Sequence, residues 1–242
     1  MNLAYWLANL AAWSAQTAVL IAAGAVAAWV LRLRVPRVRL AYWQALLAVC
    51  LLLPAVEPWR PAADSNIEVS TSDARPVAPN RSSAHSVPWR QAVLLVLVFG
   101  CAARAVWLAL GFAKLHRWRR DAPVFSPLPP RLDLLRAGVA PQAEFRLSPS
   151  LSGPVTFGLW QPVVVLPGSF AALPAAIQEA IVCHELVHVR RRDWIVTVVE
   201  QAIRAALWFH PAIWWLTGQA QLAREQTWMA RWWRSPGIVR NI

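Results

Sequence analysis

The sequence predicts a mainly α-helical membrane protein with three or four transmembrane helices and a small α+β domain. Three observations support this prediction. Long uncharged apolar segments occupy the first half of the chain, a short Val-rich pattern typical of strands follows, and two histidines then lie one helical turn apart. An apolar segment of about 20 residues is long enough to cross a bilayer as a helix. The 242 residues therefore combine a membrane part with a more polar part.

Three segments have the length and composition of membrane spans. Residues 3–31 contain no Asp, Glu, Lys or Arg, and residues 40–56 form a second uncharged run. Residues 91–113 form a third run, interrupted only by Arg104. Each is within the range that spans a bilayer, so we predict three transmembrane helices in this half of the chain.

The charges of the connecting segments predict the orientation. Residues 32–39, within the first predicted domain (1–56), contain four arginines and no acidic residue, and residues 114–120 are also basic. Residues 57–90, rich in Pro and Ser, carry acidic and basic side chains in equal number. Basic connections stay on the cytoplasmic side. We therefore expect a multi-pass protein of the bacterial inner membrane, with 57–90 outside and 114–227 in the cytoplasm.

The net charge of +12 has an explanation that does not involve nucleic acid. The arginines gather at the ends of the apolar segments, where anionic lipid head groups attract them. We therefore predict the lipid bilayer as a partner and no nucleic acid. The three cysteines, Cys50, Cys101 and Cys183, do not predict a disulfide framework, and Cys183 is interpreted as a small core residue.

The second half of the chain predicts a short hairpin and two helices. Residues 154–167 alternate Val and Phe around a Gly-containing turn and predict two short strands. A helix is expected from Asp193 to about Phe209, where His210-Pro211 breaks it. Residues 203–217 are apolar and rich in Trp. They predict either a fourth span or a helix at the membrane interface.

A metal-binding motif lies on the helix before Asp193. His184 and His188 are four residues apart, so both rings can reach one metal ion. Zinc accepts such nitrogen ligands, and Glu185 between them can take a proton from a water molecule. Ile177 and Ile181 share the helical stripe of the histidines, which predicts that this stripe faces inward.

A catalytic zinc site takes three protein ligands, so a third is required. The later candidates in the chain are Glu200, His210 and Glu225. The spacing of these residues does not choose between them.

Four segments together resemble the integral-membrane zinc metallopeptidases of the BlaR/MecR type, which are beta-lactam sensor–transducers: residues 154–167, 184–194, 207–216 and 222–225. The resemblance implies a gluzincin-like metallopeptidase domain over 114–227 that holds Zn²⁺. It implies His184, His188 and Glu225 as the zinc ligands and Glu185 as the general base. It also implies that the hairpin lies on the substrate side.

The function implied by this resemblance is that of a membrane-embedded zinc endopeptidase that cleaves itself or a cytosolic regulator, such as a transcriptional repressor. Since the chain ends at Ile242, we expect no C-terminal sensor domain. Two alternatives stay open: a truncated, catalytically impaired membrane regulator, and a quality-control protease for membrane proteins. The sequence predicts neither the inducing signal nor the oligomeric state.

The tail, residues 228–242, departs from the family pattern. Trp228 and Met229 stand where the family has Cys-Asp after its ligand glutamate. Trp and Met have one codon each, and insertion of one pyrimidine after the first two bases would restore Cys-Asp. We therefore hypothesise a frameshifted tail. Resequencing the codons of residues 227–230 tests for an error, and an unambiguous in-frame read in independent isolates would argue against one.

Overall fold

The computed structural model describes residues 3–56 and 89–232, the side chains of residue 56 and of residues 228–232 excepted. Within them the chain forms two compact units. The helical unit contains residues 3–56, 89–100 and 209–232, and the mixed unit contains residues 101–208. The predicted external loop lies almost entirely outside the described residues, as does most of the predicted atypical tail. That residues 114–227 form one domain stays a prediction.

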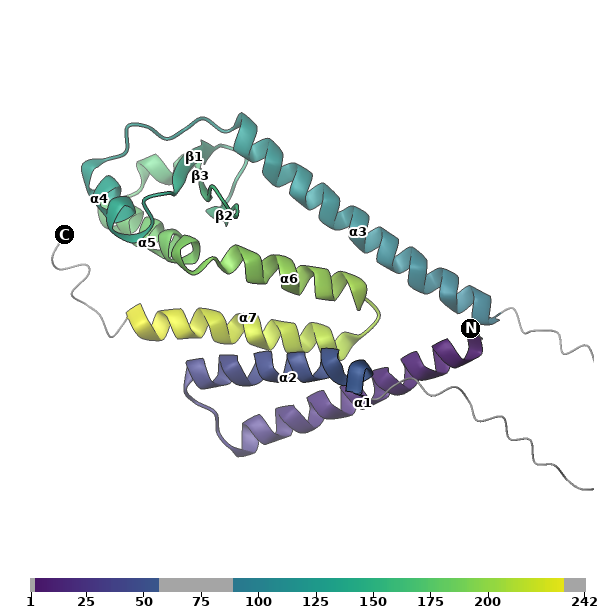
Figure 1. Cartoon of the computed structure of the whole chain (residues 1–242). Helices are drawn as coiled ribbons and strands as arrows, with labels where there is room; N and C mark the ends of the chain where they lie inside the picture. The colour runs from purple at the N-terminus through teal and green to yellow at the C-terminus, as the bar shows by residue number, and fades with distance from the viewer. Residues whose placement is uncertain (1–2, 57–88, 233–242) are drawn as a thin grey trace, which may run out of the picture. The chain divides into compact units, whose positions relative to one another are not determined.

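The three predicted spans are confirmed as helices (Figure 1): α1 (Leu3–Val30), α2 (Pro36–Val56) and α3 (Trp89–Asp121). Among the described residues, these are the helices that are long and apolar enough to cross a membrane. The segment 203–217 does not form one continuous helix. Helix α6 (Asp193–Ala206) ends within this segment, and α7 (Pro211–Trp232) starts after the break at His210. The protein is therefore a mainly α-helical membrane protein.

Helix α7 packs against α1 and α2 within the helical unit. The ring of His210, just before α7, donates from Nε2 to the carbonyl oxygen of Ser14 on α1 at 3.1 Å. Further along α7, the ring of Trp215 meets Trp43 of α2 edge-on, with centroids 5.5 Å apart. Aromatic pairs in this arrangement add to the energy of burial. These contacts fix the start of α7 beside the first two spans.

The mixed unit contains a small sheet of three strands, β1 (Glu144–Ser148), β2 (Val155–Phe157) and β3 (Val163–Pro167). It also contains four further helices: α4 (Pro130–Val139), the short η1 (Gly168–Ala172), α5 (Ala175–Arg191) and α6. The strand order is β1-β3-β2, with β1 parallel and β2 antiparallel to β3. The predicted hairpin is confirmed as β2 and β3. Strand β1 was not predicted.

Strand β3 lies at the centre of this unit. Its residues from Val163 to Leu166 are 0% exposed, which explains why it reads as a continuous apolar run rather than an alternating one. Leu132 of α4 and Val182 and Leu186 of α5 belong to the core cluster on one side of the sheet. Helix α5 is thereby held rigidly against the sheet.

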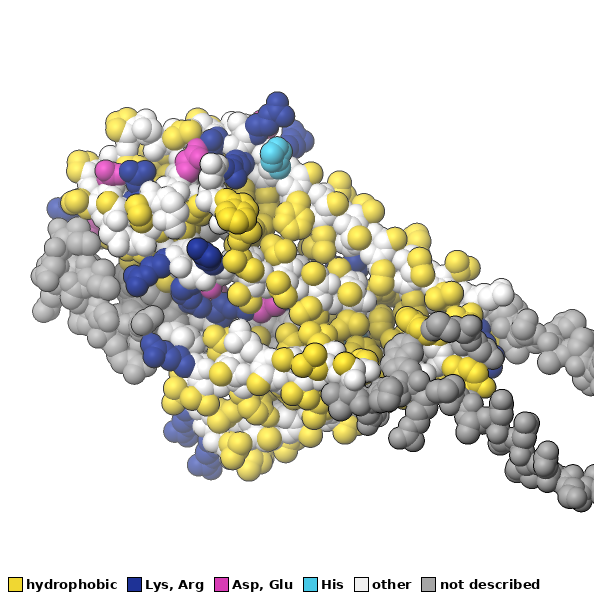
Figure 2. Space-filling view, viewed as in Figure 1, with side chains coloured by type: hydrophobic (Ala, Val, Ile, Leu, Met, Phe, Trp, Pro, Cys, Tyr) yellow, Lys and Arg dark blue, Asp and Glu magenta, His cyan; other side chains and the backbone are white. Residues whose placement is uncertain are grey.

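Helix α3 exposes apolar side chains along its length, and Lys and Arg side chains gather at its C-terminal end (Figure 2). Helix α6 contacts α3 within the mixed unit. The rings of Phe112 on α3 and Trp194 on α6 lie 5.9 Å apart, and the Cys101 thiol donates to the carbonyl oxygen of Ala206 at 3.6 Å. An apolar helix surface of this length has the chemistry of a lipid contact.

Candidate metal centre

Helix α5 carries the two histidines at the border of its buried face. The stripe that enters the core contains Val182, Leu186 and Val189. The predicted stripe is less buried, because His184 and His188 are half-buried and Ile177 is 47% exposed. The expectation that this whole stripe faces the core was therefore wrong. Side chains at the edge of a packed face can reach both the core and a ligand entering from outside.

The two imidazoles converge. His184 Nε2 and His188 Nε2 are 3.0 Å apart, and the rings are nearly perpendicular. Two nitrogens bound to one tetrahedral ion at about 2.05 Å each would be about 3.3 Å apart. The pair therefore fits one small metal ion with only a slight opening of the rings.

Asp193 determines which ring nitrogen of His188 carries the proton. The Nδ1 of this ring lies 2.7 Å from Asp193 Oδ2. A carboxylate only accepts hydrogen bonds, so Nδ1 is the donor and Nε2 keeps its lone pair for a metal. Histidines that bind metal ions usually have such a partner, and the structure thus supplies an additional feature of a metal centre.

The turn between α5 and α6 brings Asp193 back to the histidine. Arg192 has φ 55° and ψ 39°, the left-handed conformation, and its backbone N–H caps the end of α5. Helix α6 then begins at Asp193, whose side chain is buried. Asp193 was not predicted as a site residue. Its position five residues after His188, at the start of a new helix, was the available signal.

Glu185 is held by a second residue that sequence analysis missed. Glu185 is 7% exposed, and its carboxylate accepts a hydrogen bond from Thr156 Oγ1 at 2.5 Å. Thr156 is the middle residue of β2, an edge strand of the sheet. The strand therefore lies directly beside the residue predicted to act as the base. No feature of the sequence pattern distinguishes Thr156 from other strand residues.

The candidates for a third ligand lie on different elements. Glu200 is on α6, seven residues beyond Asp193 and so about 10 Å further along that helix. His210 uses both ring nitrogens within the helical unit: Nε2 donates to Ser14, and Nδ1 accepts from the backbone N–H of Ile213 at 3.4 Å. Glu225 is a half-buried residue of α7. Its role as a ligand stays a prediction.

Cys183, the residue before His184, is buried. Its side chain is 5% exposed and lies in the packed face of α5. Desolvation by burial raises the pKa of this thiol above its ordinary value. Its burial agrees with the prediction that Cys183 is a small core residue.

Comparison with known proteins relates the chain to one family. The family model described as BlaR1 peptidase M56 matches residues 2–227. The regulatory protein BlaR1 of Bacillus licheniformis is 30% identical to this chain over 78 residues. This aligned part covers 32% of the chain and 13% of the relative. The family match ends at Thr227, directly before Trp228 and Met229. Because the match covers nearly the whole chain, the protein belongs to the BlaR1-type M56 peptidase family.

Proposed function

We propose that this protein is a membrane-embedded zinc-dependent endopeptidase that cleaves itself or a cytosolic regulator. In this proposal His184, His188 and Glu225 bind the zinc, and Glu185 is the general base. The observation that supports it best is the convergence of the two Nε2 atoms, with Asp193 bonded behind one ring. Such an arrangement directs two ring nitrogens at one point, where a single ion can bind both.

The residues of the chain divide the chemistry between them. Zinc, when bound, supplies a Lewis acid that makes a water molecule more acidic and polarises a peptide carbonyl. Glu185 takes the proton of the attacking water and passes it to the leaving amine. The hydroxyl of Thr156 holds that carboxylate in place. Asp193 keeps His188 in the tautomer that binds metal and stabilises its ring orientation.

The outer edge of β2 is the proposed substrate side of the site. Strand β3 pairs with its inner edge. In the described part of the chain, the outer edge has no backbone hydrogen-bond partner. An extended peptide can add to such an edge through main-chain hydrogen bonds. A peptide bound beside Thr156 would pass close to Glu185, as a peptidase requires.

The identity of the substrate is proposed from the relative. Bacillus licheniformis BlaR1 is described as a regulatory protein, and a regulator acting through a peptidase domain needs a protein target. The basic segments at 32–39 and 114–120 support an orientation with the site on the cytoplasmic side of the bacterial inner membrane. We therefore propose a cytosolic regulator, such as a transcriptional repressor, or the chain itself.

Glu185→Gln tests the catalytic proposal. The full-length protein is reconstituted in liposomes, and cleavage of itself and of candidate repressors is followed by mass spectrometry. Glu179→Gln is the matched control, because Glu179 is on the same helix and its carboxylate bonds Arg131 on α4. Glu185→Gln should abolish cleavage and keep the zinc, whereas Glu179→Gln should cleave normally. Equal cleavage by the parent protein and Glu185→Gln would refute the role of this base.

The ligand set is tested separately by metal analysis. The purified parent protein should hold about one zinc per chain, and Glu225→Ala should lose it. Zinc retained at the parent level in Glu225→Ala would exclude Glu225 as a ligand without contradicting Glu185 as the base.

A second candidate function is a catalytically impaired membrane regulator. The end of the family match at residue 227 favours it, because Trp228 and Met229 follow at once. In this case the parent protein would hold no zinc and Glu185→Gln would leave signalling in cells intact. A quality-control protease would instead cleave many misfolded membrane proteins in the same reconstituted assay.

A further inference from the structure

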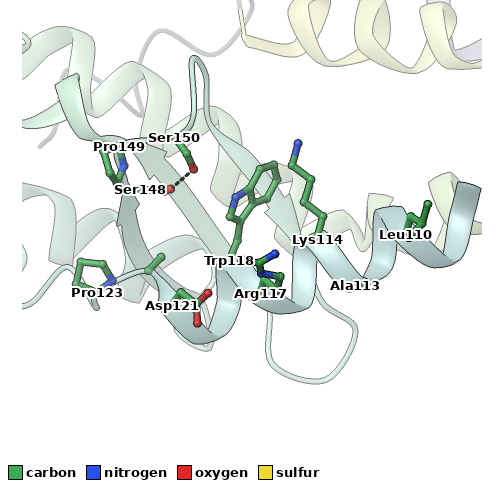
Figure 3. A pocket seen from close by; sticks show the side chains of 11 residues that line it. Leu110, Ala113, Lys114, Arg117, Trp118, Asp121, Pro123, Ser148, Pro149 and Ser150 are labelled. Atoms are coloured by element: carbon green, nitrogen blue, oxygen red, sulfur yellow. Dashed lines mark hydrogen bonds between the residues drawn. The ribbon is translucent and has the colours of Figure 1, made fainter.

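A pocket of about 590 Å³ lies at the C-terminal end of α3, within the mixed unit (Figure 3). One wall is the last turns of α3, and the other is the end of β1 with the residues that follow it. Trp118 stands between the Ser148–Ser150 pair and Lys114 in this view. The pocket is distinct from the metal centre, because none of its lining residues is on α5 or α6. They are Leu110, Ala113, Lys114, Arg117, Trp118, Asp121, Ala122, Pro123, Ser148, Pro149 and Ser150.

The polar groups of the pocket suit a phosphate. Lys114 and Arg117 are exposed, and in the described part of the chain the guanidinium of Arg117 has neither a hydrogen bond nor an ion pair. The Lys114 ammonium lies 4.9 Å from the Trp118 ring centroid. This contact restricts the positions that the flexible Lys114 side chain can adopt. Asp121 is the one acidic residue of the lining. Two cations against one carboxylate leave the pocket positive.

The paired hydroxyls add a directed donor. The Oγ atoms of Ser148 and Ser150 are 2.8 Å apart, and Ser148 is buried. Each hydroxyl has one proton. Since one proton joins the pair, the other is left to donate to a ligand in the pocket. A phosphate oxygen accepts such a bond and also pairs with a guanidinium.

The position of the pocket identifies the source of the phosphate. Leu110 and Ala113 belong to the end of the apolar segment that we assign to the membrane, and Lys114 is the first charged residue after it. The pocket is therefore apolar on the membrane side and basic where lipid head groups lie. We propose that it binds an anionic phospholipid, with the phosphate at Arg117 and Ser150 and an acyl chain along Leu110.

Soluble phosphate has the same charge but lacks the apolar part. Basic pockets beside membrane helices are known to bind lipid head groups. The Leu110 and Ala113 side of the pocket would gain nothing from inorganic phosphate, whereas an acyl chain would cover it. A lipid ligand would also hold the end of α3 against the loop after β1, and so stiffen the connection between the span and the sheet.

Native mass spectrometry of the full-length protein in a neutral detergent tests the proposal. Phosphatidylglycerol is titrated against the parent protein and against Arg117→Gln. Arg120→Gln is the matched control, because Arg120 is an exposed arginine on the same helix that does not line the pocket. Arg117→Gln should weaken binding about tenfold, as expected for lost charge-assisted bonds, whereas Arg120→Gln should stay within about twofold. Ser150→Ala, which changes no charge, should weaken binding about threefold.

Three outcomes would overturn the proposal. Equal losses in Arg117→Gln and Arg120→Gln would mean that a basic surface attracts anionic lipid without a defined site. Equal affinity for phosphatidylcholine would exclude a site for anionic lipid. Inorganic phosphate bound as tightly as the lipid would show that a soluble anion occupies the pocket. Thermal unfolding of each variant without lipid checks that the exposed substitutions leave the fold intact.

Discussion

The bond between Asp193 and His188 makes a sharp prediction about metal affinity. Asp193→Asn removes the negative charge and leaves an amide oxygen that can still accept from Nδ1. Asp193→Ala removes both the charge and the bond. Because the N···O distance is 2.7 Å and the Asp193 side chain is only 12% exposed, water replaces the lost partner poorly. Zinc affinity should therefore fall in the order parent, Asn, Ala.

The size of the loss follows from the position of Asp193. Loss of such a partner typically costs 10–100-fold in metal affinity, which corresponds to about 1.4–2.7 kcal/mol. We expect about tenfold for Asp193→Asn and nearer to a hundredfold for Asp193→Ala. Asp133→Asn is the control, because its carboxylate is 52% exposed and bonds Arg136 on the surface of α4. This control should leave zinc affinity unchanged.

The assay is competition for zinc with a chromophoric chelator, with the full-length protein in detergent. Thermal unfolding without metal is measured in parallel, because Asp193 also opens α6 and favours its N-terminus by about 0.3–1 kcal/mol. A zinc affinity within twofold of the parent in both Asp193 variants would refute the reasoning. So would an equal loss in Asp133→Asn.

Three further predictions concern the neighbouring elements. Thr156→Val should lower kcat about tenfold with zinc retained, and Thr156→Ser should keep kcat near that of the parent, because its hydroxyl can still donate to Glu185. Peptide cleavage kinetics and metal analysis check this. Leu186→Ala should destabilise the mixed unit by about 2–5 kcal/mol, whereas Ile177→Ala should cost below about 0.5 kcal/mol, because Leu186 is 0% and Ile177 47% exposed. Unfolding in detergent measures both changes. Cys183 should resist alkylation at pH 7.5 in the folded protein and react rapidly once unfolded, because its raised pKa keeps the thiol neutral. For the same reason, the contribution of Cys183 to the free energy of unfolding should fall only as the pH rises through the thiol pKa of the unfolded chain, near 8.5, where the unfolded state begins to ionise first.

The spans and the metal motif were predictable because each rests on a local pattern. The absence of charge over 3–31 and the spacing of His184 and His188 are visible in the printed chain. A bilayer requires a helix of sufficient apolar length, and one helical turn places residues four apart on the same side. The hairpin at 154–167 was found for a similar reason, since a short Val-rich run bounded by Pro is typical of a strand.

The missed strand and the wrong prediction both depended on distant parts of the chain. Strand β1 carries two charged residues, Glu144 and Arg146, which form an ion pair on one face of the strand. It becomes a strand by pairing with β3. The stripe that contains Ile177 was predicted to face the core, because helical periodicity shows which residues share a face. It does not give which face meets the sheet, and the contacts of β3 decide that.

The sequence by itself determined that this chain enters a membrane and presents two histidines and a glutamate on one helix. Those properties need only local spacing and composition. The tertiary structure decided which residues support them. Asp193 reaches His188 because Arg192 turns the chain between two helices, and Thr156 reaches Glu185 because β2 lies beside α5. Residues 29 positions apart, as Thr156 and Glu185 are, are brought together only when the sheet and helix bury their shared apolar surface.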